Sequence, residues 1–191
     1  MNPGEVRALV ARAFSGDPLM TWIFPDAEHR LESLAAWLGI AVERYLTTGR
    51  AESADRDGAL TAVALWRLPG TAVPADDGSL PTSPGLLRAL VGPAHGEAVA
   101  EGFAAVRRQV PPSEEPHAYL QFLAVAPGAQ GRGLGGELLD RVVEQAAGAR
   151  LPLRLDTTNP VNLPFYEAHG LRVRSAAQLG PSGPTMWSLE R

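Results

Sequence analysis

The chain has 191 residues and a formal net charge of −4, and it contains neither cysteine nor lysine, so all 17 of its cationic side chains are arginine. This length predicts a single domain over residues 1–191 with a substantial core. The acidic balance offers no field for nucleic acid or an anionic membrane. The missing residue types exclude disulfides, thiolate chemistry, a lysine-dependent phosphate loop and a Schiff base with pyridoxal phosphate.

The N-terminal residues do not carry a basic segment followed by an apolar run, so we expect no signal peptide. No apolar stretch has the length that a bilayer-spanning helix needs. We therefore expect a cytoplasmic protein.

The first third of the chain predicts helices followed by a β-hairpin. Apolar spacing favours helices over 3–14 and 28–48, and strands over 50–53 and 59–68. A turn signal at 55–58 joins the two strands. The segment 17–26, bracketed by two prolines, is a loop or short helix with two open interpretations. It is either a hydrophobic plug on the core or one wall of a substrate pocket, through Trp22 and Phe24.

The remaining elements predict a strand–helix–strand unit with further helices on either side. Residues 71–84 are rich in Pro, Asp, Gly and Ser and read as a loop. Helices are expected at 85–92, 97–110, 133–147 and 161–169, and strands at 117–125, 151–157, 171–178 and 185–189. The strands at 117–125 and 151–157 should be parallel, with a right-handed crossover between them.

The most informative stretch is the glycine-rich loop that joins the strand 117–125 to the next helix. The run from Gln130 to Gly136 contains four glycines at the point where the helix begins. Unpaired backbone N–H groups and the helix dipole make such a helix start suitable for a phosphate or pyrophosphate. Glycines allow the backbone to approach the anion without a Cβ in the way.

One interpretation of this loop is a nicotinamide dinucleotide site. Residues Gly131 to Gly136 match Gly-x-Gly-x-x-Gly, and Asp156 follows 20 residues later at a strand end, where a ribose-binding acid is expected. Five residues separate the strand from the first glycine, however, and only 34 residues follow Thr157. That remainder is too short for the rest of a doubly wound sheet.

The second interpretation takes the same residues as Gln130-x-x-Gly133-x-Gly135, which resembles the pyrophosphate loop of the GNAT superfamily of acyl-CoA-dependent N-acyltransferases. The resemblance continues downstream, where Asn159 precedes Tyr166 by seven residues and Gly-Leu follows. Together the two motifs cover about residues 117 to 175. The stretches around His117 and from 158 to 166 are most similar to the branch that includes puromycin N-acetyltransferase.

The resemblance implies an α+β fold: a mixed, mostly antiparallel twisted sheet with a central parallel pair, flanked by helices. It implies direct transfer of an acetyl group from acetyl-CoA, the co-substrate, to an amine. The pantetheine arm would lie along the backbone of Leu123, Ala124 and Val125. The implied pyrophosphate ligands are Gln130, Gly131, Arg132, Gly133, Leu134, Gly135 and Gly136. The implied contacts near the second parallel strand are Asn159, Asn162 and Tyr166.

The resemblance makes Tyr166 the general acid, because a tyrosine can donate a proton to the departing thiolate; the alternative is an aromatic side chain that only packs a helix. A base is also needed, since deprotonating an alkylamine of pKa about 10.4 costs roughly 4–5 kcal/mol at neutral pH. His117 is the candidate base and Glu115 the second. The alternative is that His117 only forms a structural hydrogen bond.

Alternation along the strand places Tyr119 and Gln121 with His117 on one face, where they would meet the acceptor together with Trp22 and Phe24. The other histidines lack partners at useful spacing, so no metal is expected. The sequence thus predicts an N-acetyltransferase acting on a small-molecule amine, as a monomer or homodimer. A nicotinamide-dependent oxidoreductase and a non-catalytic acyl-CoA sensor remain the alternatives.

Overall fold

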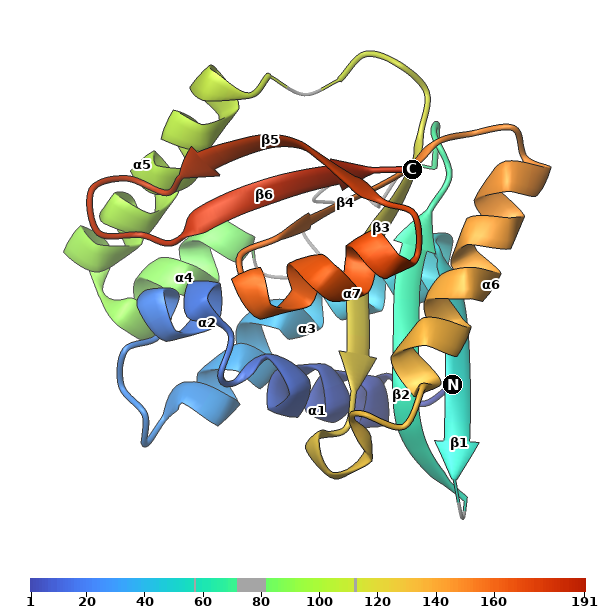
Figure 1. Ribbon diagram of the computed structural model, residues 1–191. Coiled ribbons are helices and arrows are strands. Elements are labelled where there is room, and N and C mark those ends of the chain that lie inside the picture. The colour runs from blue at the N-terminus through green and yellow to red at the C-terminus, as the bar shows by residue number, and fades with distance from the viewer. Residues whose placement is uncertain (57, 72–81, 112) are drawn as a thin grey trace.

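The computed structural model describes residues 1–56, 58–71, 82–111 and 113–191. Helices cover both faces of one twisted sheet (Figure 1). The helices are α1 (Pro3–Phe14), α2 (Pro18–Ile23), α3 (Arg30–Thr48), α4 (Ser83–Val91), α5 (Pro93–Gln109), α6 (Leu134–Gly148) and α7 (Leu163–Ala168), with short 3-10 turns η1 (Pro127–Ala129) and η2 (Pro160–Asn162). The strands are β1 (Arg50–Arg56), β2 (Ala59–Arg67), β3 (Ala118–Val125), β4 (Leu153–Thr157), β5 (Arg172–Gln178) and β6 (Thr185–Glu190).

Several helices begin where a side-chain cap precedes a proline. The side chains of Asn2, Asp17 and Thr82 each accept a hydrogen bond from a backbone N–H of the first turn of α1, α2 and α4. Each of these helices carries a proline in its first two positions, where a proline does not remove a hydrogen bond that the helix needs. Helix α5 also begins at a proline, Pro93, but it has no side-chain cap, and it starts four residues before the start predicted from apolar spacing.

The sheet has the strand order β1-β2-β3-β4-β6-β5, in which β3 and β4 are parallel and all other neighbours are antiparallel. This confirms the mixed, mostly antiparallel sheet with a central parallel pair. Strand β6 lies between β4 and β5. The chain therefore forms the edge strand β5 first and then returns to place β6 beside β4. The sequence predicted the final pair of strands but not this order.

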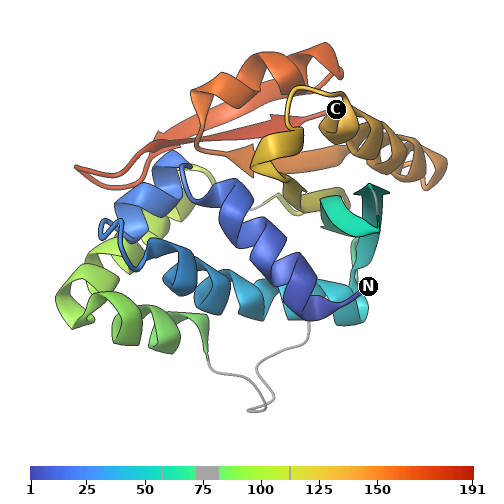
Figure 2. The same cartoon turned by 90° about the horizontal axis from the view of Figure 1, so that it is seen from below.

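The sheet separates two hydrophobic cores, and Figure 2 shows the helices that cover them as layers on either side of the sheet. Helices α1 to α5 cover one face, and the core beneath them includes Leu9, Leu34 and Phe122. Helices α6 and α7 cover the other face, over a core that includes Leu138 and Leu155. Burial of apolar side chains on both faces of the sheet stabilises the packing of the helices against it.

A β-bulge changes the alternation of β3. Leu65 pairs with Phe122 and the next residue, Trp66, pairs with Leu120, so Gln121 is the extra residue. Beyond the bulge Phe122 faces the core under α1 to α5, whereas Leu120 before it faces the core under α6. The strict alternation expected for this strand therefore ends at Gln121.

The predicted elements differ from the observed ones mainly at their ends. The segment 17–26 contains the short helix α2, and the segment 161–169 divides into η2 and α7. Within the predicted loop 71–84, residues 72–81 lie outside the described residues, and α4 begins before the loop was expected to end. Residue 57 of the predicted turn also lies outside them.

Candidate active site

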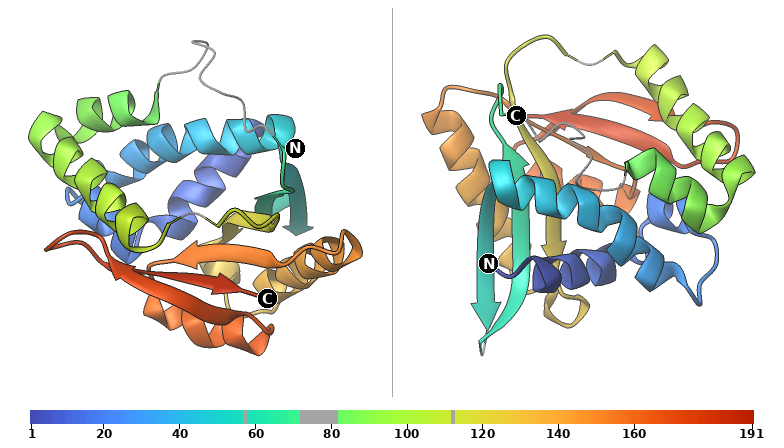
Figure 3. Two further views of the ribbon diagram at one scale, coloured as in Figure 1. Left: turned by 90° about the horizontal axis from the view of Figure 1, so that it is seen from above. Right: turned by 180° about the vertical axis from the view of Figure 1, so that it is seen from behind.

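A cavity of about 1110 Å³ opens where β3 and β4 separate, and its walls come from both halves of the chain. The parallel pairing is limited to Ala118–Leu120 opposite Leu153–Leu155. Beyond it, β3 continues along β2 while β4 continues along β6, and Figure 3 shows the two groups of strands diverging. Among the described strands, the edge of β3 that faces the opening therefore has no partner.

Backbone groups of Leu123 and Val125 point into this opening. The N–H of Ala126 donates to the carbonyl of Thr61 on the β2 side, and antiparallel strands alternate the direction of these groups residue by residue. Leu123 and Val125 thus present their N–H and C=O groups away from β2. Ala124 directs its backbone toward β2 and its methyl group into the core, so the structure does not bring this predicted cofactor residue to the opening.

The loop after β3 has the backbone geometry that an anion site needs. Gly131 and Gly133 adopt φ values of 72° and 84°, which favour glycine, and the space next to each is open. Gly133 is the N-cap of α6 and provides no side-chain cap, and the first helical bond runs from the N–H of Glu137. Among the described residues, the N–H groups of the first turn therefore have no partner.

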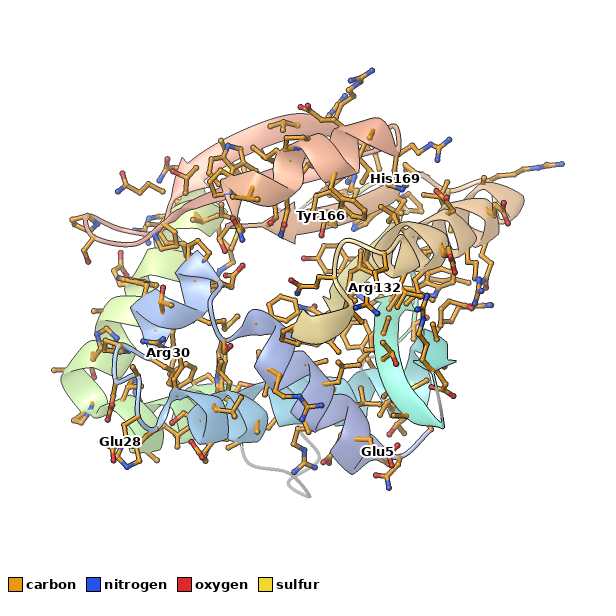
Figure 4. The ribbon with its side chains drawn as sticks, turned by 60° about the horizontal axis from the view of Figure 1, so that its bottom comes forward. Glu5, Glu28, Arg30, Arg132, Tyr166 and His169 are labelled. Carbon is orange, nitrogen blue, oxygen red and sulfur yellow. The ribbon has the colours of Figure 1, made fainter. Side chains whose placement is uncertain are left out.

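The side chains in this loop have different roles. The amide of Gln130 donates to the carbonyl of Val125 at 3.2 Å, which ties the loop to the end of β3. Arg132 is exposed and lies just before the start of α6 (Figure 4). Leu134 is buried in the core, so only its backbone N–H can serve a cofactor.

Two glycines of the loop also allow α7 to pack closely on α6. A Cβ at Gly136 would lie 3.0 Å from Nε2 of His169, and one at Gly135 would lie 3.8 Å from the Phe165 ring. Nδ1 of His169 donates to the carbonyl of Phe165 at 2.7 Å. The motif glycines therefore serve helix packing as well as access to the backbone N–H groups.

The segment after β4 places its polar side chains near the cavity. Asn159 caps η2 by accepting from the N–H of Val161 at 3.1 Å, while Asn162 lines the cavity. The hydroxyl of Thr158 donates to Oδ1 of Asp17 at 2.9 Å. This bond joins residues 141 positions apart, across the opening between the two halves of the chain.

Tyr166 lies on α7 with its ring buried and lines the same cavity. Burial, followed by the negative charge of Asp17, raises the pKa of Tyr166 to about 12. Burial also raises the pKa of Asp17, whose Oδ1 accepts from both Thr158 and the N–H of Leu19. Sequence reasoning missed Asp17, because its only local signal is that of a helix cap.

His117 immediately precedes β3 and lines the cavity. Its Nδ1 lies 2.7 Å from the carbonyl oxygen of Glu115, which can only accept, so Nδ1 is the donor. In the neutral ring this leaves the lone pair on Nε2. The carboxylate of Glu115 pairs with Arg154 at 3.1 Å, which leaves His117 as the less committed proton acceptor of the two.

The face of β3 next to His117 carries a hydrogen-bonded polar group. The hydroxyl of Tyr119 donates to Oδ2 of Asp156 at 2.8 Å, and that of Tyr45 donates to Oε1 of Gln121 at 3.2 Å. Burial, together with the charge of Asp156, holds the pKa of Tyr119 well above its ordinary value. Asp156 itself lines the cavity, whereas from the sequence we expected a structural residue there, or a ribose-binding acid under the dinucleotide interpretation.

Among the described residues that line the cavity, the aromatic segment 17–26 contributes Asp17, Leu19 and Met20, but not Trp22 or Phe24. Phe24 is 3% exposed and packs edge-on against Trp37. Trp22 lies against Gly102 of α5 and donates from Nε1 to Ser182. The hydrophobic-plug interpretation of this segment therefore describes the packing of both aromatic residues.

Within the described ranges, no group of three or more His, Asp or Glu side chains is arranged to hold a metal ion. The helices in the same ranges are all too short or too polar to cross a bilayer.

The family comparison agrees with this geometry. Residues 76–171, half of the chain, match the acetyltransferase (GNAT) family. The chain belongs to the GNAT family. It is an acyl-CoA-dependent N-acetyltransferase whose co-substrate is acetyl-CoA.

Solved structures share the fold over nearly the whole chain. A histone acetyltransferase HPA2-related protein from Corynebacterium glutamicum is 23% identical, with a TM-score of 0.69 over 98% of this chain and 89% of its own. A mosquito arylalkylamine N-acetyltransferase-like protein is 14% identical, with a TM-score of 0.56 over 99% and 94%. Chaetomium thermophilum Naa20, solved with a bisubstrate analogue, is 17% identical, with a TM-score of 0.51 over 100% and 83%.

The topology also decides between the two cofactor interpretations of the loop. A dinucleotide fold needs an open, mostly parallel sheet, whereas only β3 and β4 are parallel among the described strands. Asp156 faces two hydroxyl groups of neighbouring strands rather than a free ribose site. The sheet is therefore that of a GNAT protein, a family that uses acetyl-CoA, and not that of a dinucleotide-binding fold.

Proposed function

We propose that this acetyltransferase moves the acetyl group of acetyl-CoA directly to a primary amine of a small molecule, an antibiotic or a metabolite. The main support is that one cavity joins the unpaired edge of β3, the hydroxyl of Tyr166 and the imidazole of His117. The resemblance of residues 117–175 to the puromycin N-acetyltransferase branch also favours a small-molecule acceptor. Residues 1–191 act as one domain in this proposal, because the cavity is lined from Phe14 to Glu190.

The residues present fit acetyl-CoA as the co-substrate. The open N–H groups at the start of α6, with Gln130 and Arg132 beside them, provide ligands for the pyrophosphate. The outward N–H and C=O groups of Leu123 and the N–H of Val125 offer the pantetheine amides the hydrogen bonds of an additional strand, while the C=O of Val125 accepts from Gln130. A backbone N–H at this edge can also polarise the thioester carbonyl.

In the proposed reaction the amine nitrogen attacks the thioester carbon, and the C–S bond breaks as the amide C–N bond forms. The amine loses a proton, for which Nε2 of His117 is the acceptor because Nδ1 already donates to Glu115. The departing sulfur gains negative charge and is met by the hydroxyl of Tyr166. No covalent intermediate with the protein is needed, in keeping with a chain without cysteine or lysine.

The burial of Tyr166 limits how far its hydroxyl can transfer a proton to the departing sulfur. Complete proton transfer from a phenol whose pKa is raised to about 12 to a thiolate of pKa about 8.5 costs roughly 5 kcal/mol. Tyr166 therefore acts mainly as a hydrogen-bond donor that stabilises the thiolate while it forms. The elevated pKa keeps this donor protonated throughout the physiological pH range.

A screen of primary amines for acetyl-CoA-dependent thiol release tests the proposal. The expected result is stoichiometric release of CoA and formation of an amide with a subset of amines. Binding of acetyl-CoA without transfer to any amine or peptide amine would instead support the acyl-CoA sensor. Transfer only to peptide N-termini or to protein lysines would replace the small-molecule acceptor by a peptide one.

A further inference from the structure

Asp156 is held on the cavity wall by hydroxyl groups from the strands on both sides of β4. Tyr119 on β3 donates to Oδ2 at 2.8 Å, and Ser188 on β6 donates to Oδ1 at 2.5 Å. All three residues line the cavity, and the Asp156 side chain is exposed toward it. A carboxylate with one neutral donor on each oxygen has a fixed orientation and keeps lone pairs for a ligand.

No arginine neutralises this carboxylate in the described part of the chain. Arg154 pairs with Glu115 and Glu190, and Arg174 lies near Glu190. The guanidinium of Arg67 lies over the ring of Tyr119, with 5.4 Å between its carbon and the ring centroid. These three cations thus have other partners, while within the described residues Asp156 receives hydrogen bonds only from uncharged hydroxyls.

The position of Asp156 along β4 places it beside the separation of the strands. Leu155 is the last residue of β4 that pairs with β3, so Asp156 is the first beyond that pairing. Tyr119, which donates to Asp156, also contacts the imidazole of His117, at 6.4 Å between ring centroids. One tyrosine ring therefore separates the carboxylate from the proposed proton acceptor.

Half-buried apolar side chains from the helical layer line other parts of the same cavity. They are Phe14, Leu19, Trp37, Phe103 and Val106. A ligand whose cationic group binds Asp156 can therefore also bury an apolar body in the same cavity. Burial of that apolar surface contributes favourable binding free energy.

From these contacts we infer that Asp156 is the binding site for the ammonium group of the acceptor, and that the acceptor class is a cationic alkylamine with an apolar body. This inference rests on the proposed function and narrows its substrate class. The ammonium form binds to the two free lone-pair positions of the carboxylate. One proton of the ammonium passes to Nε2 of His117 before the amine attacks, and the second, lost as the amide forms, is taken up by the departing thiolate, which leaves as the thiol.

Two isomeric amines test the inference, because they have the same molecular formula but differ in charge near neutral pH. 2-Phenylethylamine is cationic near neutral pH, whereas 4-ethylaniline is neutral because its lone pair is delocalised into the ring. Asp156→Asn keeps the size of the side chain and removes the charge. It is expected to raise KM for 2-phenylethylamine about tenfold or more, while KM for 4-ethylaniline and for acetyl-CoA changes less than about threefold.

Two further variants separate charge from structure. Asp156→Glu retains the carboxylate and is expected to keep the preference for the cationic isomer. Glu144→Gln, at an exposed position of α6 outside the cavity, removes a charge and should alter neither KM. Equal losses for both isomers in Asp156→Asn, an unchanged KM for the cation, or weakened acetyl-CoA binding would each overturn the inference.

Calorimetric titration of 2-phenylethylamine into the protein saturated with CoA provides a readout that does not depend on turnover. If the wild type binds the amine and Asp156→Asn weakens this binding about tenfold, the inference holds even where no acetyl transfer is observed. Binding without transfer would thus overturn the proposed function and leave the inference about Asp156 intact. Binding of equal strength in both proteins, or of neither isomer to the wild type, overturns the inference whether or not transfer to other amines occurs.

Discussion

Tyr166 and Asp17 meet at one cavity although 149 positions separate them in the chain. Asp17 is a helix cap in local terms, since its Oδ1 accepts from the N–H of Leu19. The same oxygen accepts from Thr158, so the cap also holds the end of β4. Its charge then acts on Tyr166, whose pKa it raises further after burial has done so.

Tyr166→Phe should lower kcat by about 10²-fold or more, since the variant cannot donate to the departing thiolate. KM for acetyl-CoA should change little, because the ring and its packing remain. In the wild type, the pKa of about 12 predicts no loss of activity from ionisation of Tyr166 on the alkaline side until near that pH. Steady-state kinetics as a function of pH measures both effects.

Tyr45→Phe is the matched control for this change. Tyr45 is also a buried tyrosine, but in the described structure it is not among the residues that line the cavity. The kcat of the Tyr45→Phe variant should remain within a few fold of the wild-type value. Equal turnover in Tyr166→Phe and the wild type would remove Tyr166 from the mechanism.

His117→Ala should lower kcat/KM for the amine by about 10²-fold, because the variant lacks the Nε2 lone pair that accepts the proton of the amine. Steady-state kinetics with the amine varied at saturating acetyl-CoA measures this loss. A kcat/KM that stays within a few fold of the wild type would assign the base to another group.

At the scale of elements, the glycine loop and the strand–helix–strand unit were predictable because their signals are local. Glycine spacing, strand-ending prolines and helical apolar spacing all lie within residues 117–157. The bulge at Gln121 was not predictable, since it depends on the register between β2 and β3. The contact of Asp156 with Tyr119 depends on how β4 pairs, for which the sequence carries no local signal.

Gly133→Ala is expected to raise KM for acetyl-CoA about tenfold. Its φ of 84° costs an alanine roughly 1–2 kcal/mol, and the new methyl group stands where the loop exposes its backbone. Gly128→Ala is the matched control, because this glycine lies in the same loop, has no positive φ and has open space around it. The idea fails if both variants change KM equally.

At the scale of the whole molecule, the sheet is continuous but its two groups of strands share only a short parallel pairing. The strands β1, β2 and β3 pack against α1 and α3 on one face, and β4, β6 and β5 extend away from them (Figure 3). Across the opening, the described residues include the Thr158–Asp17 bond as a direct polar link. A ligand that bonds to the free edge of β3 and to the start of α6 gives partners to the backbone groups that border this opening.

Coenzyme A should therefore raise the thermal stability of the whole fold, and NAD should not. At a concentration 100 times its Kd, a ligand that binds only the folded state adds about 2.7 kcal/mol. For a chain of this size that corresponds to a rise in Tm of about 5–10 °C. Amide hydrogen exchange should slow at residues 123 and 125 and at 131–136, where free N–H groups acquire partners, and Gly133→Ala should reduce both effects. A Tm shift with NAD as large as that with CoA would mean that the loop recognises dinucleotides and pyrophosphates in general.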